Sequence, residues 1–487
     1  MRSTFRCLTL LAAALASTFA ATGTAAAADS AGDAPRGSRP NIILCMADDQ
    51  GWGDTGYNGH PLMKTPHLDD MAASGLRFDH FYAAHCVCSP TRASVLTGRH
   101  PNRMGAFAWG HTLRPQEVTV AEALQQAGYA TAHFGKWHVG SVRLGSPVNP
   151  GNSGFDHWLS APNYYDNDPI LSLNGKAVQL EGESSIVAAD AAIEFIRERV
   201  DAGKPFLAVV WFGSPHYPHR AAKEDRALYE GQKHPDWLGE ITGLDRAVGK
   251  LRAALREMDV HENTLFWYTS DNGGLQPESS GGRAKKGSIY EGGLRVPAII
   301  EWPEQIARPR TTDMPAVTSD IYPTLLEIVG VDVENQPPLD GVSLLPTILG
   351  QEQEHPPIGF WDYPANGIST PAAKWMAELL EAQKQGDTDG DDRRLRLNAA
   401  EIDPLPRDDR RGHAAWLDWP WKLHRIVGQG GKEKIELYNL ADDPMEAENV
   451  AADHPQRVQS MLEALDKWQA SVVQSQRGAD YADLQSQ

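Results

Sequence analysis

The chain has 487 residues, of which 41% are hydrophobic and 22% are charged, and its formal net charge is −19 at pH 7. This length suits one large domain accompanied by a smaller one. The excess of acidic residues argues against binding to nucleic acid or to an anionic membrane, so an anionic substrate would need a local cluster of cations.

Residues 1–28 have the pattern of a secretory signal peptide. Arg2 and Arg6 give a positive start, a mainly apolar run follows at residues 8–16, and consecutive alanines close the segment as a cleavage region. The apolar run is too short to span a bilayer, and no later segment approaches the required length. We therefore expect a secreted or periplasmic protein with no membrane span.

Removal of the signal peptide takes Cys7 away and leaves three cysteines, Cys45, Cys86 and Cys88. An odd number is a poor disulfide framework for an exported protein, so at least one thiol needs another explanation. Cys86 either pairs with Cys45 or packs in the interior, and the sequence favours neither alternative.

From residue 40 onward, short apolar runs alternate with helical patterns, which is typical of an α/β fold with a mainly parallel sheet. The runs at 41–46, 129–134, 206–212 and 264–269 are the expected strands. Helical patterns occupy residues 186–200, 241–258 and 456–472, and a capping box at Thr119 and Glu122 begins a further helix that Gly128 ends.

Polar side chains follow each of the four expected strands. In chain order they are Asp48 and Asp49, then Lys136 and His138, then His216, then Asp271 and Asn272. Ligands bind at the carboxyl edge of open α/β sheets, so we expect these side chains to meet there. One such cluster is compatible with an ordinary polar turn, whereas four at one edge indicate a site.

The segment Cys88-Ser89-Pro90-Thr91-Arg92 begins another expected helix. Pro90 suits the first turn of a helix, and Gly98 can end it. The start of a helix presents unpaired N–H groups and the positive end of the helix dipole, which together attract an anion. Arg92 adds a planar cation suited to tetrahedral oxyanions. Cys88 is thus either a reactive group at an anion site or a buried structural thiol.

These candidate residues fall into two chemical sets. The oxygen donors, which suit Ca²⁺ or Mg²⁺ and not a zinc-only site, are Asp48, Asp49, Asp271 and Asn272. The cations and proton donors are Arg92, Lys136, His138, His216 and Lys286. A metal and a ring of cations around a nucleophile at a helix start are typical of the transfer of a doubly charged oxyanion group.

The segment 88–92, followed by Leu96-Thr97-Gly98-Arg99, resembles the signature of the sulfatase family. Other segments resemble motifs of that family and occur in the family's order: 39–54, 135–138, 214–216, 271–274, 286–288 and 291–297. They cover the chain from about residue 38 to 345, and residues 436–444 resemble the family's C-terminal segment.

The resemblance implies an alkaline-phosphatase-like α/β sandwich. A large, mainly parallel mixed sheet is flanked by helices and accompanied by a smaller C-terminal α+β domain with an antiparallel sheet. The domain boundaries that we expect are a signal peptide at 1–28, a linker at 29–37, a catalytic domain at 38–350, a C-terminal subdomain at 351–475 with an inserted solvated loop at about 383–411, and a tail at 476–487.

The resemblance also implies hydrolysis of sulfate esters by a formylglycine that a maturation enzyme makes from Cys88. In this scheme one Ca²⁺ ion is held by residue 88 together with Asp48, Asp49, Asp271 and Asn272. The hydrated aldehyde of residue 88 is held by Arg92 and Lys136, and its proton goes to His138. Sulfate binding and protonation of the leaving oxygen fall to His216 and Lys286. The family often places a small hydroxyl residue near the sulfate from the loop at 162–166, where this chain has Asn163 and Tyr164, so that subsite stays unassigned.

Secretion and aromatic content favour sulfated carbohydrates over small aryl sulfates as substrates. The aromatic residues of the C-terminal part either stack on sugar rings or form a core: they are Trp361, Tyr363, Trp416, Trp419 and Trp421. Three alternatives stay open. They are an arylsulfatase for small aryl sulfates, a phosphate or phosphonate ester hydrolase on the same scaffold, and a carbohydrate-binding protein in which Cys88 is never converted.

Overall fold

The computed structural model describes residues 39–386 and 403–481. The expected signal peptide and linker therefore lie outside the described residues. Within 39–481 the described strands form two sheets, one of eleven strands and one of four. The large sheet has the order β10-β2-β9-β8-β1-β7-β3-β4-β5-β6, and β11 pairs with β2.

Four neighbouring parallel strands form the centre of the large sheet. β1 (Asn41–Ala47) lies between β7 (Phe206–Trp211) and β8 (Thr264–Ser270), and β3 (Ala130–Lys136) pairs with β7. The strands outside this centre are β2 (Leu76–Tyr82), β4 (His157–Ala161), β5 (Ile170–Leu173), β6 (Lys176–Gln179), β9 (Arg295–Glu301), β10 (Arg310–Thr312) and β11 (Ala316–Val317). β9 runs antiparallel to both β8 and β2, so the sheet is mixed and mainly parallel, as expected.

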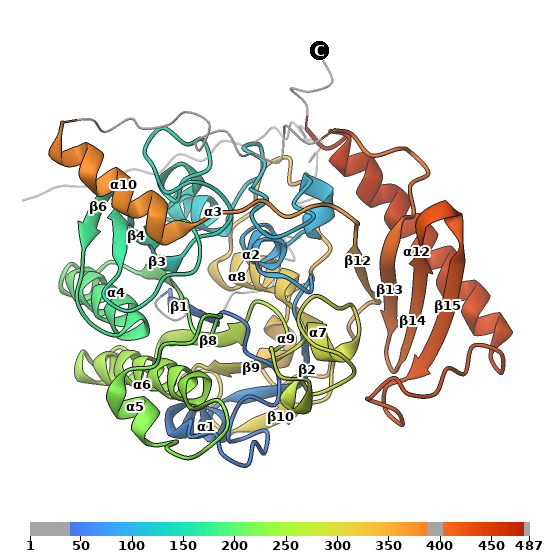
Figure 1. The fold of residues 1–487 in the computed structure, drawn as a ribbon, viewed down its shortest axis with the longest axis horizontal. Helices are drawn as coiled ribbons and strands as arrows, with labels where there is room; N and C mark the ends of the chain where they lie inside the picture. The colour runs from blue at the N-terminus through green and yellow to red at the C-terminus, as the bar shows by residue number, and fades with distance from the viewer. Residues whose placement is uncertain (1–38, 387–402, 482–487) are drawn as a thin grey trace, which may run out of the picture. The chain divides into compact units, whose positions relative to one another are not determined.

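Helices cover both faces of the large sheet (Figure 1). Alternate side chains of β1 enter separate apolar clusters, since Ile42 and Ile43 belong to different ones. The Ile43 cluster includes residues of α1 (Pro66–Ser74), α4 (Ser184–Asp201) and α6 (Pro235–Glu257). The Ile42 cluster includes residues of α2 (Cys88–Thr97), α3 (Val120–Gln126) and α8 (Ile321–Val329). Burial on both faces explains why the central strands are continuous apolar runs.

The helix boundaries follow the expected local signals. Gly98 ends α2 with a left-handed φ of 70°, and Thr119 and Glu122 form both bonds of the capping box that begins α3. α6 begins at Pro235, several residues before the expected start, because Trp237 and Leu238 are buried and extend its apolar face. Short helices are α5 (Lys223–Ala227), α7 (Glu291–Leu294) and α9 (Leu345–Ile348).

The small sheet is an antiparallel meander of β12 (Ile358–Asp362), β13 (Gly412–Asp418), β14 (Trp421–Val427) and β15 (Glu433–Asn439). Helix α12 (Pro455–Gln476) packs on β13 and β14. Trp361 and Tyr363 are buried in the cluster beneath α12, against which Trp416 and Trp421 also pack. These aromatic side chains thus form a core. The two sheets together confirm the expected fold class.

Between β12 and β13 the chain returns to the large sheet. Helix α10 (Ala372–Lys384) contacts β5 and β6, and Gln383 at its end accepts a hydrogen bond from the Ala177 amide at 2.7 Å. The first residues of the loop expected at 383–411 are therefore helical. Residues 387–402 lie outside the described part. Beyond them, Leu405 is buried and its amide bonds to the Gln476 side chain.

Candidate active site

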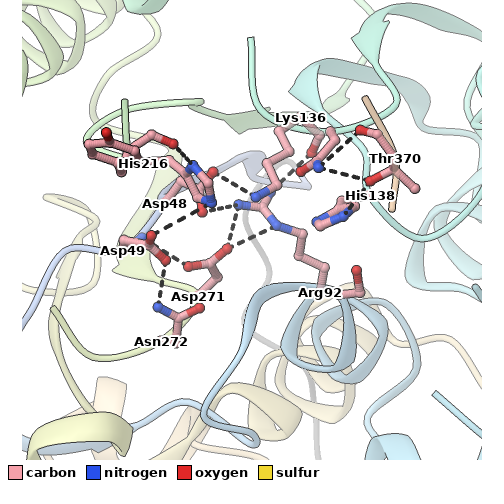
Figure 2. A network of polar contacts seen from close by, with 12 residues as sticks. Asp48, Asp49, Arg92, Lys136, His138, His216, Asp271, Asn272 and Thr370 are labelled. Carbon is pink, nitrogen blue, oxygen red and sulfur yellow. Dashed lines mark hydrogen bonds and ion pairs between the residues drawn. The ribbon is translucent and has the colours of Figure 1, made fainter. Parts of the chain in front are cut away.

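The polar residues predicted from the sequence meet at the carboxyl edge of the four central strands (Figure 2). Asp48 and Asp49 follow β1, Asp271 and Asn272 follow β8, and Lys136 is the last residue of β3. Because β8, β1, β7 and β3 are neighbours and parallel, their carboxyl ends lie side by side. Helix α2 brings Cys88 and Arg92 to the same edge, where Cys88, Asp48 and Asp271 have ligand atoms within 4.8 Å of one another.

Two cations neutralise the carboxylates of Asp48 and Asp271. Lys136 Nζ lies 2.7 Å from Asp48 Oδ2, and Arg92 Nη2 lies 2.6 Å from Asp271 Oδ2. Arg92 also donates to the Lys136 carbonyl at 3.0 Å, and its guanidinium lies 5.1 Å from the ring centroid of Trp211. All four charged side chains are fully buried, so these bonds fix the Arg92 guanidinium in one orientation.

Asp49 is surrounded by a second group of polar side chains. Lys286 Nζ lies 2.5 Å from its Oδ1, Asn272 Nδ2 donates to the same oxygen at 2.8 Å, and His216 Nε2 lies 3.8 Å from Oδ2. The backbone of Asp49 is left-handed, with a φ of 73°. A non-glycine residue held in this region costs free energy and is commonly found at functional sites.

Burial and neighbouring charges shift the pKa values of Asp48 and Asp49 in opposite directions. Burial, together with repulsion from Asp271 and Asp49, raises the pKa of Asp48 to about 7 although Lys136 opposes the shift. Burial also acts to raise the pKa of Asp49, but the nearby cations, above all Lys286, outweigh it and hold that pKa below its usual range.

Two buried oxygens at this edge lack hydrogen-bond partners among the described residues. They are Asp48 Oδ1 and Asn272 Oδ1. Buried acceptors without partners are rare because each costs desolvation free energy. A divalent ion with oxygen ligands would satisfy both, so the donor set of Asp48, Asp49, Asp271 and Asn272 fits a hard cation such as Ca²⁺.

Two histidines lie near this centre. His138 Nε2 is 3.1 Å from Thr370 Oγ1, while its Nδ1 is buried and has no hydrogen-bond partner in the described part of the chain. Burial, reinforced by Lys136 and Arg92, holds the pKa of His138 well below its usual value. His216 stacks on Tyr164 with ring centroids 5.1 Å apart, and burial lowers its pKa to about 4.

The chain matches the family model described as Sulfatase over residues 40–331. It belongs to the sulfatase family. It is 32% identical over 367 residues to N-acetylgalactosamine-6-sulfatase of Canis lupus familiaris, covering 66% of this chain and 68% of the relative. It is 36% identical over 363 residues to arylsulfatase A of Bos taurus, covering 64% of this chain and 68% of the relative. The protein is therefore a sulfuric ester hydrolase, and the alternative of a carbohydrate-binding protein without activity is wrong.

Solved structures agree with this assignment. Ps i-CgsB in complex with k-i-k-neocarrahexaose has a TM-score of 0.74 at 26% identity, covering 91% of this sulfatase and 97% of that chain. The phosphonate monoester hydrolase of Agrobacterium radiobacter has a TM-score of 0.60 at 20% identity, covering 89% of this chain and 96% of that chain. The latter similarity concerns the fold alone and gives no support to the phosphonate alternative.

Sequence reasoning missed one contact of this sulfatase site. Thr370 lies between β12 and α10 and contacts His138 (Figure 2). It also accepts a hydrogen bond from Asn163 Nδ2 to its Oγ1 at 2.8 Å. The segment around Thr370 matches no motif, and a lone threonine carries no signal of its distant partners. Of the two alternatives for Cys86, packing is observed, because Cys45 and Cys86 are both buried and free.

Proposed function

We propose that the protein is an exported, calcium-dependent sulfatase that acts on sulfated carbohydrates through a formylglycine made from Cys88. The observation that carries this proposal is the position of Cys88. It is the first residue of α2 and lies among the carboxylates of Asp48 and Asp271, with Arg92 one turn further along the helix. An anionic group at this point meets free N–H groups, the helix dipole and a fixed guanidinium together.

The formylglycine made from Cys88 would supply, as its hydrate, one hydroxyl as a nucleophile and a second hydroxyl through which sulfate could be released. A Ca²⁺ ion held at this site would supply positive charge for the sulfate oxygens. Its ligands on this chain would be residue 88 and the four oxygen donors Asp48, Asp49, Asp271 and Asn272.

The remaining side chains bind the reacting groups and move protons. Arg92 and Lys136 are held rigidly by the carboxylates beside them and would orient residue 88. His138 is neutral because its pKa is low, and its Nδ1, which has no hydrogen-bond partner among residues 39–386 and 403–481, can accept a proton. His216 and Lys286 flank Asp49 on the other side, from where they would bind sulfate and protonate the leaving oxygen.

Exposed aromatic side chains beside the site support a carbohydrate substrate. Tyr217 follows His216 and is 69% exposed, and Trp109 is 44% exposed. Trp109 precedes Gly110, whose amide donates to Ser89 Oγ at 2.8 Å next to Cys88. Exposed aromatic faces suit the apolar faces of sugar rings. The relatives named for N-acetylgalactosamine 6-sulfate hydrolysis and the structure containing a carrahexaose point the same way.

The second candidate is an arylsulfatase for small aryl sulfates, which the 36% identity to arylsulfatase A favours. Rates on a panel of defined sulfated saccharides, set beside the rate on a small aryl sulfate, distinguish the two. A clear preference in kcat/KM for one saccharide supports the proposal. Comparable rates on the aryl ester and on every saccharide would favour the second candidate.

Two parts of the proposal have direct tests. The peptide that contains Cys88 should lose about 18 Da when the protein is co-expressed with a formylglycine-generating enzyme. Export should yield a mature protein that begins after residue 28. No helix of residues 39–386 or 403–481 is long and apolar enough to cross a membrane.

A further inference from the structure

A second cluster of metal-ligating side chains lies beside the segment that leads to Cys88. Its members are His85, Cys86 and Asp362, and each offers one ligand atom within 4.8 Å of the others. His85 and Cys86 lie between β2 and α2, while Asp362 ends β12 of the small sheet. None of the three belongs to the calcium site or has a role in sulfate ester hydrolysis.

Both other groups lie close to the imidazole of His85. Cys86 Sγ is 3.8 Å from His85 Nδ1, and Asp362 Oδ1 is 3.8 Å from His85 Nε2. The His85 and Cys86 side chains are buried, whereas the Asp362 side chain is 41% exposed. A cation held here would thus have buried nitrogen and sulfur ligands and one side open to water through Asp362.

His85 Nε2 is the second observation that points to a ligand. This nitrogen is fully buried and has no hydrogen-bond partner among the described residues. The Asp362 oxygen at 3.8 Å is too far away to be a hydrogen-bond partner. An unpaired imidazole nitrogen in the interior costs free energy unless a bound group satisfies it, and a metal ion between His85 and Asp362 would do so.

The donor types select the metal. Thiolate and imidazole suit Zn²⁺ and other borderline transition metals, whereas Ca²⁺ prefers oxygen alone. In a tetrahedral zinc site with these ligands, neighbouring nitrogen and sulfur atoms are about 3.5 Å apart. The ligand atoms of the three residues lie within 4.8 Å of one another, so the cluster would have to contract to hold one ion, and the partly exposed Asp362 side chain has room to move inward.

We propose that His85, Cys86 and Asp362 bind one Zn²⁺-like transition-metal ion, with water in the fourth position. Binding would release the Cys86 thiol proton to solvent and form metal bonds to sulfur, nitrogen and oxygen. The ion would join the segment before Cys88 to the small sheet. That segment is already anchored, since Thr91 Oγ1 donates to the His85 carbonyl at 2.9 Å and the Cys86 carbonyl accepts from Gly287 at 2.9 Å.

Cobalt substitution tests the site without relying on enzyme activity. The Cys88→Ala protein is saturated with Ca²⁺ and titrated with Co²⁺, so that a thiolate-to-cobalt charge-transfer band cannot arise from Cys88. We expect the band to saturate at one equivalent, to be lost in Cys86→Ser, and to persist in the matched control Cys45→Ser, whose thiol is buried elsewhere. Asp362→Asn, at a partly exposed position, should weaken Co²⁺ binding by about tenfold.

Three results would overturn the proposal. They are absence of the band in Cys88→Ala, its persistence after Cys86→Ser, and unchanged Co²⁺ affinity in Asp362→Asn. Circular dichroism establishes whether each variant is folded, and Asp362→Asn gives a decisive result even if Cys86→Ser fails to fold. Zn²⁺ content by elemental analysis gives the same answer independently, with one equivalent expected in the Cys88→Ala protein and none after Cys86→Ser.

Discussion

The hydroxyl of Thr370 should be needed for the proton transfer that we assign to His138. Thr370 Oγ1 lies 3.1 Å from His138 Nε2 and also accepts from Asn163 Nδ2 at 2.8 Å. In Thr370→Val the side chain keeps its shape and loses this oxygen, while Asn163 retains the Thr370 carbonyl at 3.2 Å. His138 would then have neither ring nitrogen hydrogen-bonded within the described residues.

Loss of one hydrogen bond to a buried group costs about 1–3 kcal/mol. If misorientation of His138 raises the activation free energy by this amount, kcat falls by roughly 5- to 150-fold. KM should change little, because Thr370 contacts neither the carboxylates nor the cations assigned to sulfate. Steady-state kinetics of wild type, Thr370→Val and the control Thr370→Ser measure both parameters. Wild-type kcat in Thr370→Val, or an equal loss in Thr370→Ser, would refute a positioning role.

Three further perturbations follow from the structure. Chelation should reduce activity and melting temperature together, with recovery on addition of Ca²⁺ and not of Na⁺; activity unchanged after complete Ca²⁺ removal would contradict the assigned ligands. Lys422→Met removes the cation that pairs with the buried carboxylates of Glu291 and Glu446. The free energy of unfolding, measured by urea denaturation, should therefore fall by about 3–5 kcal/mol. In the control Lys434→Met, which removes an exposed cation beside Glu436, it should fall by at most about 1 kcal/mol. His355 has a raised pKa in spite of its burial because Asp320 lies 3.1 Å away, so the ion pair stabilises the fold below the ordinary histidine pKa and this contribution is lost as pH rises through the raised value. The stability difference between wild type and His355→Gln should therefore shrink from pH about 6 to pH about 9, and a difference independent of pH would exclude the pair.

The central strands and their polar ends were predictable because local chemistry determines them. Burial on both faces makes β1 a continuous apolar run, and the abrupt change to Asp48 and Asp49 marks its carboxyl end. The capping box at Thr119 and the left-handed Gly98 fix their helix ends through bonds within a few residues. Such signals are contained in the sequence itself.

Strand direction and long-range contacts were not predictable in the same way. An apolar run reports burial and not direction, so the antiparallel pairing of β9 with β8 and β2 carried no sequence signal. Thr370 and Asp362 reach the neighbourhood of Cys88 from segments without motifs. Likewise, the sequence indicated that Lys136 and Asp48 share a site, but the 2.7 Å bond between them depends on the pairing of β7 with both β3 and β1.

The most direct test of the whole account is the turnover of a chromogenic sulfate ester by the Cys88→Ala protein, measured beside wild type after co-expression with the maturation enzyme. Cys88 is a small buried residue at a helix start, so its replacement by alanine should leave the fold nearly unchanged. We expect sulfate release to be abolished in Cys88→Ala while the circular dichroism spectrum is preserved. Turnover by Cys88→Ala at a rate comparable to that of wild type would contradict it.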